Sequence, residues 1–280
     1  MYALELTNVN KSYPGFQLHD LSLKLPAGCI LGLVGENGAG KSTTIKLILD
    51  MIRRDSGENQ VLGRDNRTDF SRTTEELGVV LDEAYFPAGI TARQVNAVMK
   101  NAYRRWKEER FFEYIRRFSL PENKSFKDFS RGMKMKLAIA VALSHQARLL
   151  ILDEATSGLD PMVRDEIVDL FYEYTREEDH SILVSSHIIS DLEKLCDYIA
   201  FLHKGRLLFC EEKDRLKEHF GLLRGPRSLL DSLPPAAVRG IRQSDYAVEA
   251  LVERCRVPAS LHLDTPTVEE IILLLAKGEH

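Results

Sequence analysis

The stretch that decides the fold reads Gly35-Glu36-Asn37-Gly38-Ala39-Gly40-Lys41-Ser42-Thr43, and its first eight positions match the pattern of a phosphate-binding loop. An apolar run at 29–34 precedes it, and apolar residues at helical spacing follow over 43–52. The order is therefore strand, loop, helix, as the pattern requires. Glycines let the backbone turn with positive φ and bring successive N–H groups near phosphate oxygens, while the helix N-terminus contributes its positive dipole end.

The side chains of this loop indicate a nucleoside triphosphate and a divalent cation. Lys41 is expected to reach the β- and γ-phosphates of ATP, and the Ser42 hydroxyl is expected to ligate Mg²⁺. The predicted ATP contacts within the loop are Gly35, Glu36, Asn37, Gly38, Ala39, Gly40, Lys41, Ser42 and Thr43.

A pair of carboxylates follows a second apolar run, at 149–152. Asp153 and Glu154 stand at its C-terminal end, where open α/β sheets bind their ligands. Asp153 is predicted to hold Mg²⁺ through water, and Glu154 to polarise the attacking water as general base. An acidic pair after a strand is commonly a helix cap or part of a loop. Its position downstream of a phosphate-binding loop is what favours the catalytic interpretation.

The pattern of apolar segments predicts an α/β fold with a parallel sheet and an antiparallel edge. Thr91 and Gln94 form a capping box that opens a mostly helical insert. Asp160 as N-cap and Pro161 at the first helical position open a later helix. The predicted strands are 2–9 and 17–25 at the edge, 29–34, 77–81, 149–152 and 182–185 in the parallel sheet, and a hairpin of 199–203 with 206–210.

Two domains of unequal size are expected. The first covers 1–220, with a helical subdomain at about 90–147, and the second is a small α/β extension covering 221–280. Glycine and proline punctuate the chain after 220, which marks the boundary. The extension is predicted to end in a helix that opens with Thr265 as its cap and Pro266 directly after the cap. Its wide apolar face either packs on its own domain or makes a dimer or regulatory contact.

Composition excludes several classes of protein. The net charge of −4 argues against a protein that grips nucleic acid, and 44% hydrophobic residues provide a sizeable buried core. No apolar run reaches the roughly 18 residues of a spanning helix, and the N-terminus lacks a basic segment followed by an apolar one. We therefore expect a cytoplasmic chain without direct membrane insertion.

Five motifs occur in an order that resembles the ABC ATPase cassette over 2–220. After the phosphate-binding loop they read Phe129-Ser130-Arg131-Gly132-Met133, Leu152-Asp153-Glu154, Ser157-Gly158-Leu159-Asp160 and Ser186-His187. The resemblance implies a P-loop NTPase core with a helical signature subdomain. It also implies that two cassettes sandwich two ATP molecules, each site combining the loop of one cassette with the signature motif of the other.

The resemblance assigns further roles. Ser130 and Gly132 match the signature positions that contact the partner's nucleotide, and Asp160 matches the carboxylate at the dimer seam. His187 matches the histidine that contacts the γ-phosphate, and Tyr13 matches the aromatic residue that stacks on adenine. Lys41, Glu154 and His187 are together the predicted catalytic residues.

Two departures from the family pattern stand out. Arg131 and Met133 replace the usual glycine and glutamine of the signature, and Arg131 is expected to point outward. After the strand at 77–81 the family usually places a glutamine that touches Mg²⁺, where this chain offers Asp82 and Glu83. Asp82 is the candidate third Mg²⁺ residue beside Ser42 and Asp153, with a plain loop as the alternative.

Both departures resemble a branch of bacterial ABC-2 type exporter ATPases. The resemblance implies an ATP-hydrolysing subunit that powers export through a separately encoded transmembrane permease, peripheral on the inner face of the cell membrane. Its second cassette is either another copy of this chain or a sibling. The alternatives are a soluble ABC ATPase acting on ribosomes or DNA, which typically carries two cassettes or a long coiled-coil insert, and an ATP-binding regulator without turnover.

Overall fold

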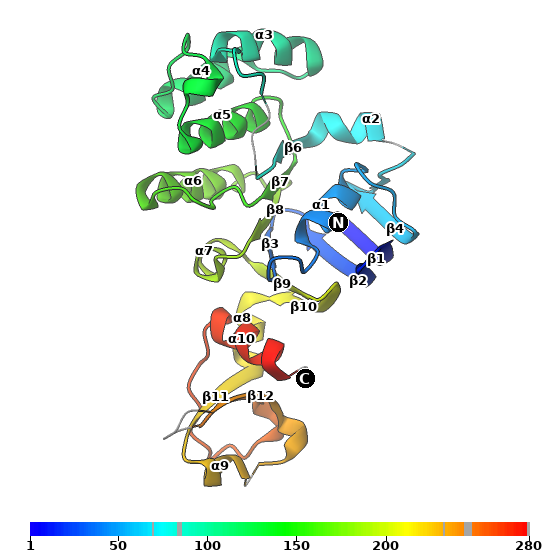
Figure 1. The fold of residues 1–280 in the computed structure, drawn as a ribbon, viewed down its shortest axis with the longest axis vertical. Coiled ribbons are helices and arrows are strands. Elements are labelled where there is room, and N and C mark those ends of the chain that lie inside the picture. Colours follow the sequence, from blue (N-terminus) through cyan, green and yellow to red (C-terminus); the bar gives the residue numbers. More distant parts are fainter. Residues whose placement is uncertain (69, 83–85, 232, 244–247, 279–280) are drawn as a thin grey trace.

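The computed structural model describes residues 1–68, 70–82, 86–231, 233–243 and 248–278. The described chain forms three sheets. Figure 1 shows the helical insert at one end of the long axis, the parallel sheet and its antiparallel neighbour in the middle, and the C-terminal segment at the other end. The mixed α/β fold that the sequence predicts is confirmed.

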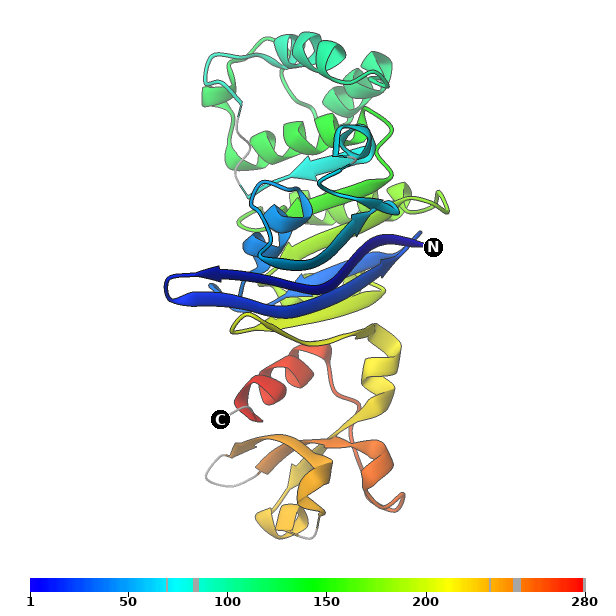
Figure 2. The ribbon, with the colours of Figure 1, turned by 90° about the vertical axis from the view of Figure 1, so that its right-hand side faces the viewer.

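The antiparallel edge sheet has the strand order β2-β1-β4-β5. Its strands are β1 (Tyr2–Tyr13), β2 (Phe16–Pro26), β4 (Ser56–Val61) and β5 (Arg64–Asp65). The first two extend beyond the predicted ranges because they stay paired up to a tight turn at Gly15, whose φ of 83° suits glycine. Figure 2 shows this long hairpin, in dark blue, running across the middle of the molecule.

The parallel sheet has the strand order β10-β9-β3-β8-β7-β6, with only β10 antiparallel to its neighbour. All residues of β3, β7 and β8 are buried, as expected for strands covered on both faces. The strands are β3 (Ile30–Val34), β6 (Leu77–Val80), β7 (Leu149–Asp153), β8 (Ser181–Ser186), β9 (Tyr198–His203) and β10 (Arg206–Glu212). The loops after β3, β6, β7 and β8 therefore leave the same edge of the sheet.

Helix α1 (Lys41–Ile48) follows β3 and is shorter than the predicted 43–52. It starts early because Gly40, with φ of 113°, is its N-cap, and it stops early because Asp50 adopts a left-handed φ of 50°. The other helices beside the parallel sheet are α2 (Phe70–Thr73), α6 (Pro161–Tyr174) and α7 (Ile189–Leu195). The predicted cap of α6 is confirmed, since Asp160 accepts the Val163 N–H at 3.0 Å.

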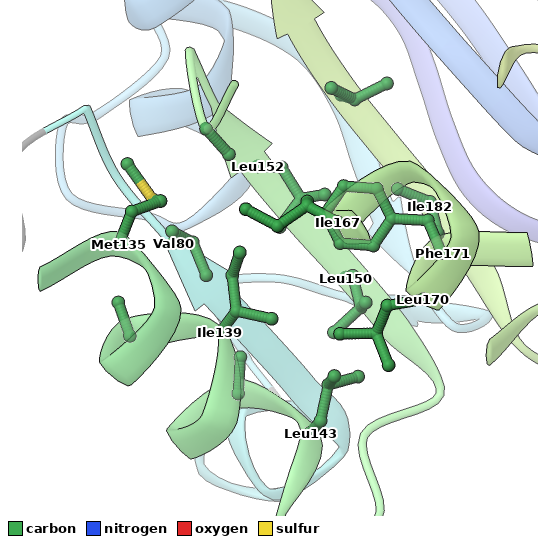
Figure 3. Close-up of a cluster of buried hydrophobic side chains, with 14 of the residues drawn as sticks. Val80, Met135, Ile139, Leu143, Leu150, Leu152, Ile167, Leu170, Phe171 and Ile182 are labelled. Carbon is green, nitrogen blue, oxygen red and sulfur yellow. The ribbon is translucent and has the colours of Figure 1, made fainter. Parts of the chain in front are cut away.

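The helical insert contains α3 (Ala92–Ala102), α4 (Glu108–Arg117) and α5 (Arg131–Leu143), with 3-10 turns η1 (Thr74–Glu76) before it and η2 (Phe126–Asp128) within it. The predicted capping box at the start of α3 is confirmed by reciprocal hydrogen bonds between Thr91 and Gln94. Figure 3 shows how α5 and α6 share one core with the strands: Met135, Ile139 and Leu143 face Val80 and Leu150, while Ile167 and Phe171 approach Ile182.

The C-terminal segment forms a three-stranded antiparallel sheet of order β11-β13-β12. Its elements are α8 (Lys213–His219), β11 (Phe220–Gly225), α9 (Arg227–Asp231), η3 (Pro235–Ala237), β12 (Val238–Gln243), β13 (Val248–Glu253), η4 (Arg254–Arg256) and α10 (Val268–Gly278).

The last helix begins later than its predicted cap. Thr265 does not cap it; instead the Glu270 N–H donates to Thr267 Oγ1 at 3.1 Å, and the Thr267 N–H donates to the Glu270 carboxylate at 2.8 Å. The prediction was wrong because the cap was assigned to the threonine before Pro266. The helix begins instead after Thr267, since the glutamate three residues later completes a capping box with it.

The apolar face of α10 is covered by its own chain. Ile271 and Leu274 pack in a cluster with residues of α8, β11 and β13, whereas Val268 and Ile272 join the core beneath the parallel sheet. Figure 1 shows α10, in red, between β10 and the C-terminal sheet. Packing within the chain is thus the alternative that the structure supports for this face, although Leu273 remains 43% exposed.

His145 connects the helical insert to the parallel sheet. Its buried ring lies 2.8 Å (Nε2) from the Leu77 carbonyl and 3.2 Å (Nδ1) from the Val141 carbonyl, and it stacks on Tyr103 at 4.0 Å. Burial lowers the pKa of His145, although the two carbonyl contacts oppose this effect. The unfolded chain therefore binds this proton more readily than the folded chain does.

This difference predicts a loss of stability in mild acid. The contribution is fully present above the unfolded pKa of about 6.5 and declines as the pH falls towards the lowered folded value, by at most about 1.4 kcal/mol per pH unit. Urea denaturation from pH 7.5 to 5 should show this decline in the wild type and a smaller one in His145→Gln, which keeps a donor but does not titrate. Parallel pH dependence in both proteins would argue against this role for His145.

Candidate functional site

The loops at the C-terminal edge of the parallel sheet enclose a cleft of about 640 Å³. Its described lining combines the phosphate-binding loop with side chains that follow β6, β7 and β8. The lining residues are Gly15, Phe16, Glu36, Asn37, Gly38, Gly40, Lys41, Ser42, Thr43, Asp82, Arg131, Glu154, Ser157 and His187. Segments up to 172 residues apart in sequence, from Gly15 to His187, thus meet at one opening.

The glycines of the loop are required by its path. A side chain at Gly35 would meet the Leu202 carbonyl at 2.5 Å, so only glycine fits against β9 there. Gly40 has φ of 113°, and a Cβ on it would lie 2.9 Å from the Phe16 ring. The loop therefore passes close under the β1–β2 hairpin before it enters α1.

Lys41 is the first residue of α1, and its ammonium group is folded back into the loop. Nζ donates to the Gly35 carbonyl at 2.7 Å and to the Glu36 carbonyl at 3.3 Å. The side chain is only 7% exposed. These carbonyl contacts hold the ammonium group in the centre of the loop, where it faces the space enclosed by the backbone.

The two predicted carboxylates leave β7 in different directions. Asp153 is buried at the end of the strand, where it accepts a hydrogen bond from Ser185 Oγ of β8. Glu154 adopts a left-handed φ of 52°, which is uncommon for a residue with a side chain and turns its carboxylate into the cleft. Its N–H is fixed by the Ser185 carbonyl at 3.2 Å.

The Glu154 carboxylate is contacted on both of its oxygens. Oε2 lies 2.7 Å from His187 Nδ1, and Oε1 lies 3.7 Å from Lys41 Nζ. Glu154 is 14% exposed, whereas His187 is 48% exposed at the mouth of the cleft. The three predicted catalytic residues are therefore brought together, from α1, the loop after β7 and the loop after β8.

The signature residues lie apart from this cluster. Ser130 is the N-cap of α5 and accepts the Met133 N–H at 3.2 Å, while Asp160 caps α6. Ser130, Gly132 and Asp160 are outside the described lining of the cleft. Arg131 belongs to that lining: its Nη2 lies 3.4 Å from Asp82 Oδ1. Glu83, the alternative to Asp82, lies outside the described residues.

Comparison with known proteins shows the family to which this chain belongs. A family model described as ABC transporter matches residues 18–157, half of the chain. The chain belongs to the ABC transporter ATP-binding family. It is 33% identical over 219 residues to the bacitracin transport ATP-binding protein BcrA of Bacillus licheniformis, covering 77% of this chain and 71% of that protein. It is 31% identical over 215 residues to the lantibiotic transport ATP-binding protein SrtF of Streptococcus pyogenes, covering 75% and 91%.

Solved structures agree with this assignment. The structure of an ATP-binding subunit of an ABC transporter superposes with a TM-score of 0.71 at 26% identity, covering 77% of this chain and 92% of that one. The structure of cbiO1 from Clostridium perfringens, part of the ABC transporter complex cbiONQ, superposes with a TM-score of 0.66 at 25% identity, covering 78% and 91%. The predicted recognition as an ABC ATPase is confirmed. In the described ranges, no helix has the length and apolar character needed to cross a membrane.

Four residues that line the ABC ATPase cleft were not among the predicted site residues: Gly15, Phe16, Arg131 and Ser157. Tyr13 lies at the tip of the β1–β2 hairpin, beneath Lys11 at 5.3 Å, while its strand partner Phe16 borders the cleft. Gly15 and Ser157 also line it. Phe16 could have been considered from sequence, since it is the aromatic residue on the second strand nearest the turn. The choice between the two rings needs the strand register.

Proposed function

We propose that this chain is the ATP-hydrolysing subunit of an exporter, in which Glu154 is the general base of hydrolysis. The observation that carries the proposal is the position of its carboxylate, between the Lys41 ammonium and the His187 ring at the mouth of a phosphate-binding loop. A carboxylate in this place accepts a proton from water as the water attacks the terminal phosphate.

The remaining side chains of the cleft complete this chemistry. Lys41 leaves its carbonyl contacts for the β- and γ-phosphates, while loop N–H groups bind phosphate oxygens. His187, which contacts Glu154, would position that carboxylate and contact the terminal phosphate. Phe16 and Tyr13, at the end of the β1–β2 hairpin, are the two aromatic candidates for stacking on adenine.

Magnesium fits the oxygen donors beside the loop. Ser42 Oγ and the Asp153 carboxylate would hold Mg²⁺, an ion that, when bound, neutralises charge on phosphate oxygens. The described residues contain no group of three or more His, Cys, Asp or Glu that could hold a metal ion alone. That sparse donor set suits Mg²⁺, which keeps several waters and binds substrate phosphates. Asp82 could bind Mg²⁺ directly only after its ion pair with Arg131 opens.

The signature residues that lie outside the cleft indicate a partner for this chain. Ser130, Gly132 and Asp160 lie outside its described lining, so we propose that they serve the nucleotide of a second cassette. That cassette is another copy of this chain or a sibling. The relatives named for bacitracin and lantibiotic transport support a role in transport. We propose that the chain performs it with a separate membrane permease, on the cytoplasmic face of the membrane.

The same proposal divides the chain into an ATPase cassette at 1–220 and an extension at 221–280. Relatives align over 192 to 219 residues, close to the length of that cassette. The C-terminal sheet begins with β11 at Phe220 and has its own apolar clusters, which supports a separate unit. The helical subdomain of the cassette corresponds to about 90–147.

Nucleotide binding by Lys41 is the first test. Lys41→Ala is expected to weaken ATP binding about ten- to a hundredfold, because charge-assisted hydrogen bonds to phosphate are lost. Isothermal titration calorimetry with ATP, together with a phosphate-release assay, measures both binding and turnover. Lys46→Ala, an exposed lysine on the same helix, is the matched control and should change neither. Unchanged affinity in Lys41→Ala, or a wild type without turnover, would contradict the proposed ATPase site.

A further inference from the structure

Two of the residues that depart from the family pattern, Arg131 and Asp82, contact each other. Arg131 is the first residue of α5, and Asp82 follows β6, so 49 positions separate them in sequence. In the fold, Arg131 Nη2 lies 3.4 Å from Asp82 Oδ1. A cation that replaces glycine has thus acquired a carboxylate partner at the position where the family usually has an amide.

The Arg131 side chain points into the chain's own cleft. It shares the lining with Lys41, Glu154 and His187, and it lies against the loop after β7: a Cβ on Gly158 would be 2.7 Å from Arg131 Nη1. The expectation that it points outward was therefore wrong. Because successive helical residues are rotated by about 100°, Arg131 can face this cleft while its neighbours Ser130 and Gly132 face elsewhere.

The charges of the cleft make this guanidinium significant. The described lining holds three carboxylates, Glu36, Asp82 and Glu154, and two permanent cations, Lys41 and Arg131. Lys41 is enclosed and bound to loop carbonyls, whereas the Arg131 and Asp82 side chains are 56% and 58% exposed. An exposed ion pair contributes little stability. A guanidinium also has five N–H donors in a fork that matches phosphate oxygens.

We propose that Arg131 binds the terminal phosphate of ATP in the cleft of its own chain, and that Asp82 holds the guanidinium in place until the nucleotide arrives. Arg131 lies against Gly158, in the loop after β7 that also carries Glu154, the residue assigned to hydrolysis. The contact is therefore made with the γ-phosphate, which ADP lacks. This inference rests on the proposed ATP site and adds a residue to it that distinguishes ATP from ADP.

The test compares ATP and ADP affinities of Arg131→Gln, Asp82→Asn and the double variant by calorimetry. Light scattering measures the molar mass in solution, and the titrations are run at a protein concentration at which the chain is monomeric. Arg131→Gln should weaken ATP binding about tenfold and leave ADP binding within about twofold, since one charge-assisted contact to the γ-phosphate is lost. Asp82→Asn should tighten ATP binding, because the phosphate no longer competes with a carboxylate. The double variant should match Arg131→Gln, because the proposal gives Asp82 no contact with the nucleotide; a difference between the two variants would point to the direct Mg²⁺ role of Asp82 and overturn its role in holding Arg131.

Controls separate this inference from the proposed function. Lys41→Ala should weaken the binding of both ATP and ADP. If it does, and Arg131→Gln changes neither affinity, the ATP site stands and the role of Arg131 is refuted. An effect of Arg131→Gln that appears only at concentrations where dimers form would place its phosphate contact in the partner's site and overturn the assignment to its own cleft. Arg116→Gln, an exposed arginine on α4, should bind both nucleotides as the wild type does. Circular dichroism confirms that each variant is folded.

Discussion

Glu154→Gln is expected to lower the ATP turnover rate by about 10²- to 10⁴-fold, the range that a general base contributes. The amide keeps the size of the side chain and can still contact His187, but it cannot accept a proton from water. ATP affinity should be retained, because the phosphate-binding loop and Lys41 are unchanged. Phosphate release under steady-state conditions measures the turnover, and calorimetry measures the affinity.

The same variant should accumulate as an ATP-bound dimer. If hydrolysis normally opens the pair of cassettes, blocking it leaves the closed state populated, and light scattering with Mg-ATP should show a dimer that the wild type does not accumulate. Glu177→Gln, an exposed glutamate in the loop before β8, is the control and should hydrolyse ATP normally. A Glu154→Gln protein that keeps more than about a tenth of its turnover would remove the general-base assignment.

The order of the elements was predictable because it depends on local patterns. Short apolar runs such as 149–152 and 182–185 are typical of strands in a sheet that is covered on both faces. The glycine-rich loop between strand and helix marks the edge of the sheet that binds the nucleotide. The motif order placed Glu154 and His187 in one ATP site, but their contact depends on the pairing of β7 with β8, which the structure shows.

Side-chain directions and element ends were less predictable. The pairing of Arg131 with Asp82 depends on how the helical insert sits against the parallel sheet, which no local pattern encodes. The choice between Tyr13 and Phe16 depends on strand register at a tight turn. The start of α10 was predicted two residues too early. Thr265 and Thr267 are both possible caps, and only Thr267 has a glutamate three positions later that completes a capping box.

Phe171→Ala is expected to destabilise the folded protein by about 3–5 kcal/mol, the range for removing a large aromatic side chain from a core. Phe171 is 0% exposed on α6 and belongs to the core that joins α5, α6 and the parallel sheet. Figure 3 shows its ring beside Ile167 and Ile182, so alanine at this position would leave a cavity between them. Urea denaturation followed by circular dichroism measures the change in the free energy of unfolding.

Met162→Ala is the matched control, because Met162 lies on the same helix and is 83% exposed. Its free energy of unfolding should change by no more than about 0.5 kcal/mol. Equal destabilisation by the two variants would contradict a role for the buried face of α6, because alanine does not lower helix propensity at either position. Phe171 is outside the described lining of the cleft, so the folded fraction of Phe171→Ala should hydrolyse ATP at the wild-type rate. A lower rate per folded molecule would show that core packing also sets the position of the loop that carries Glu154.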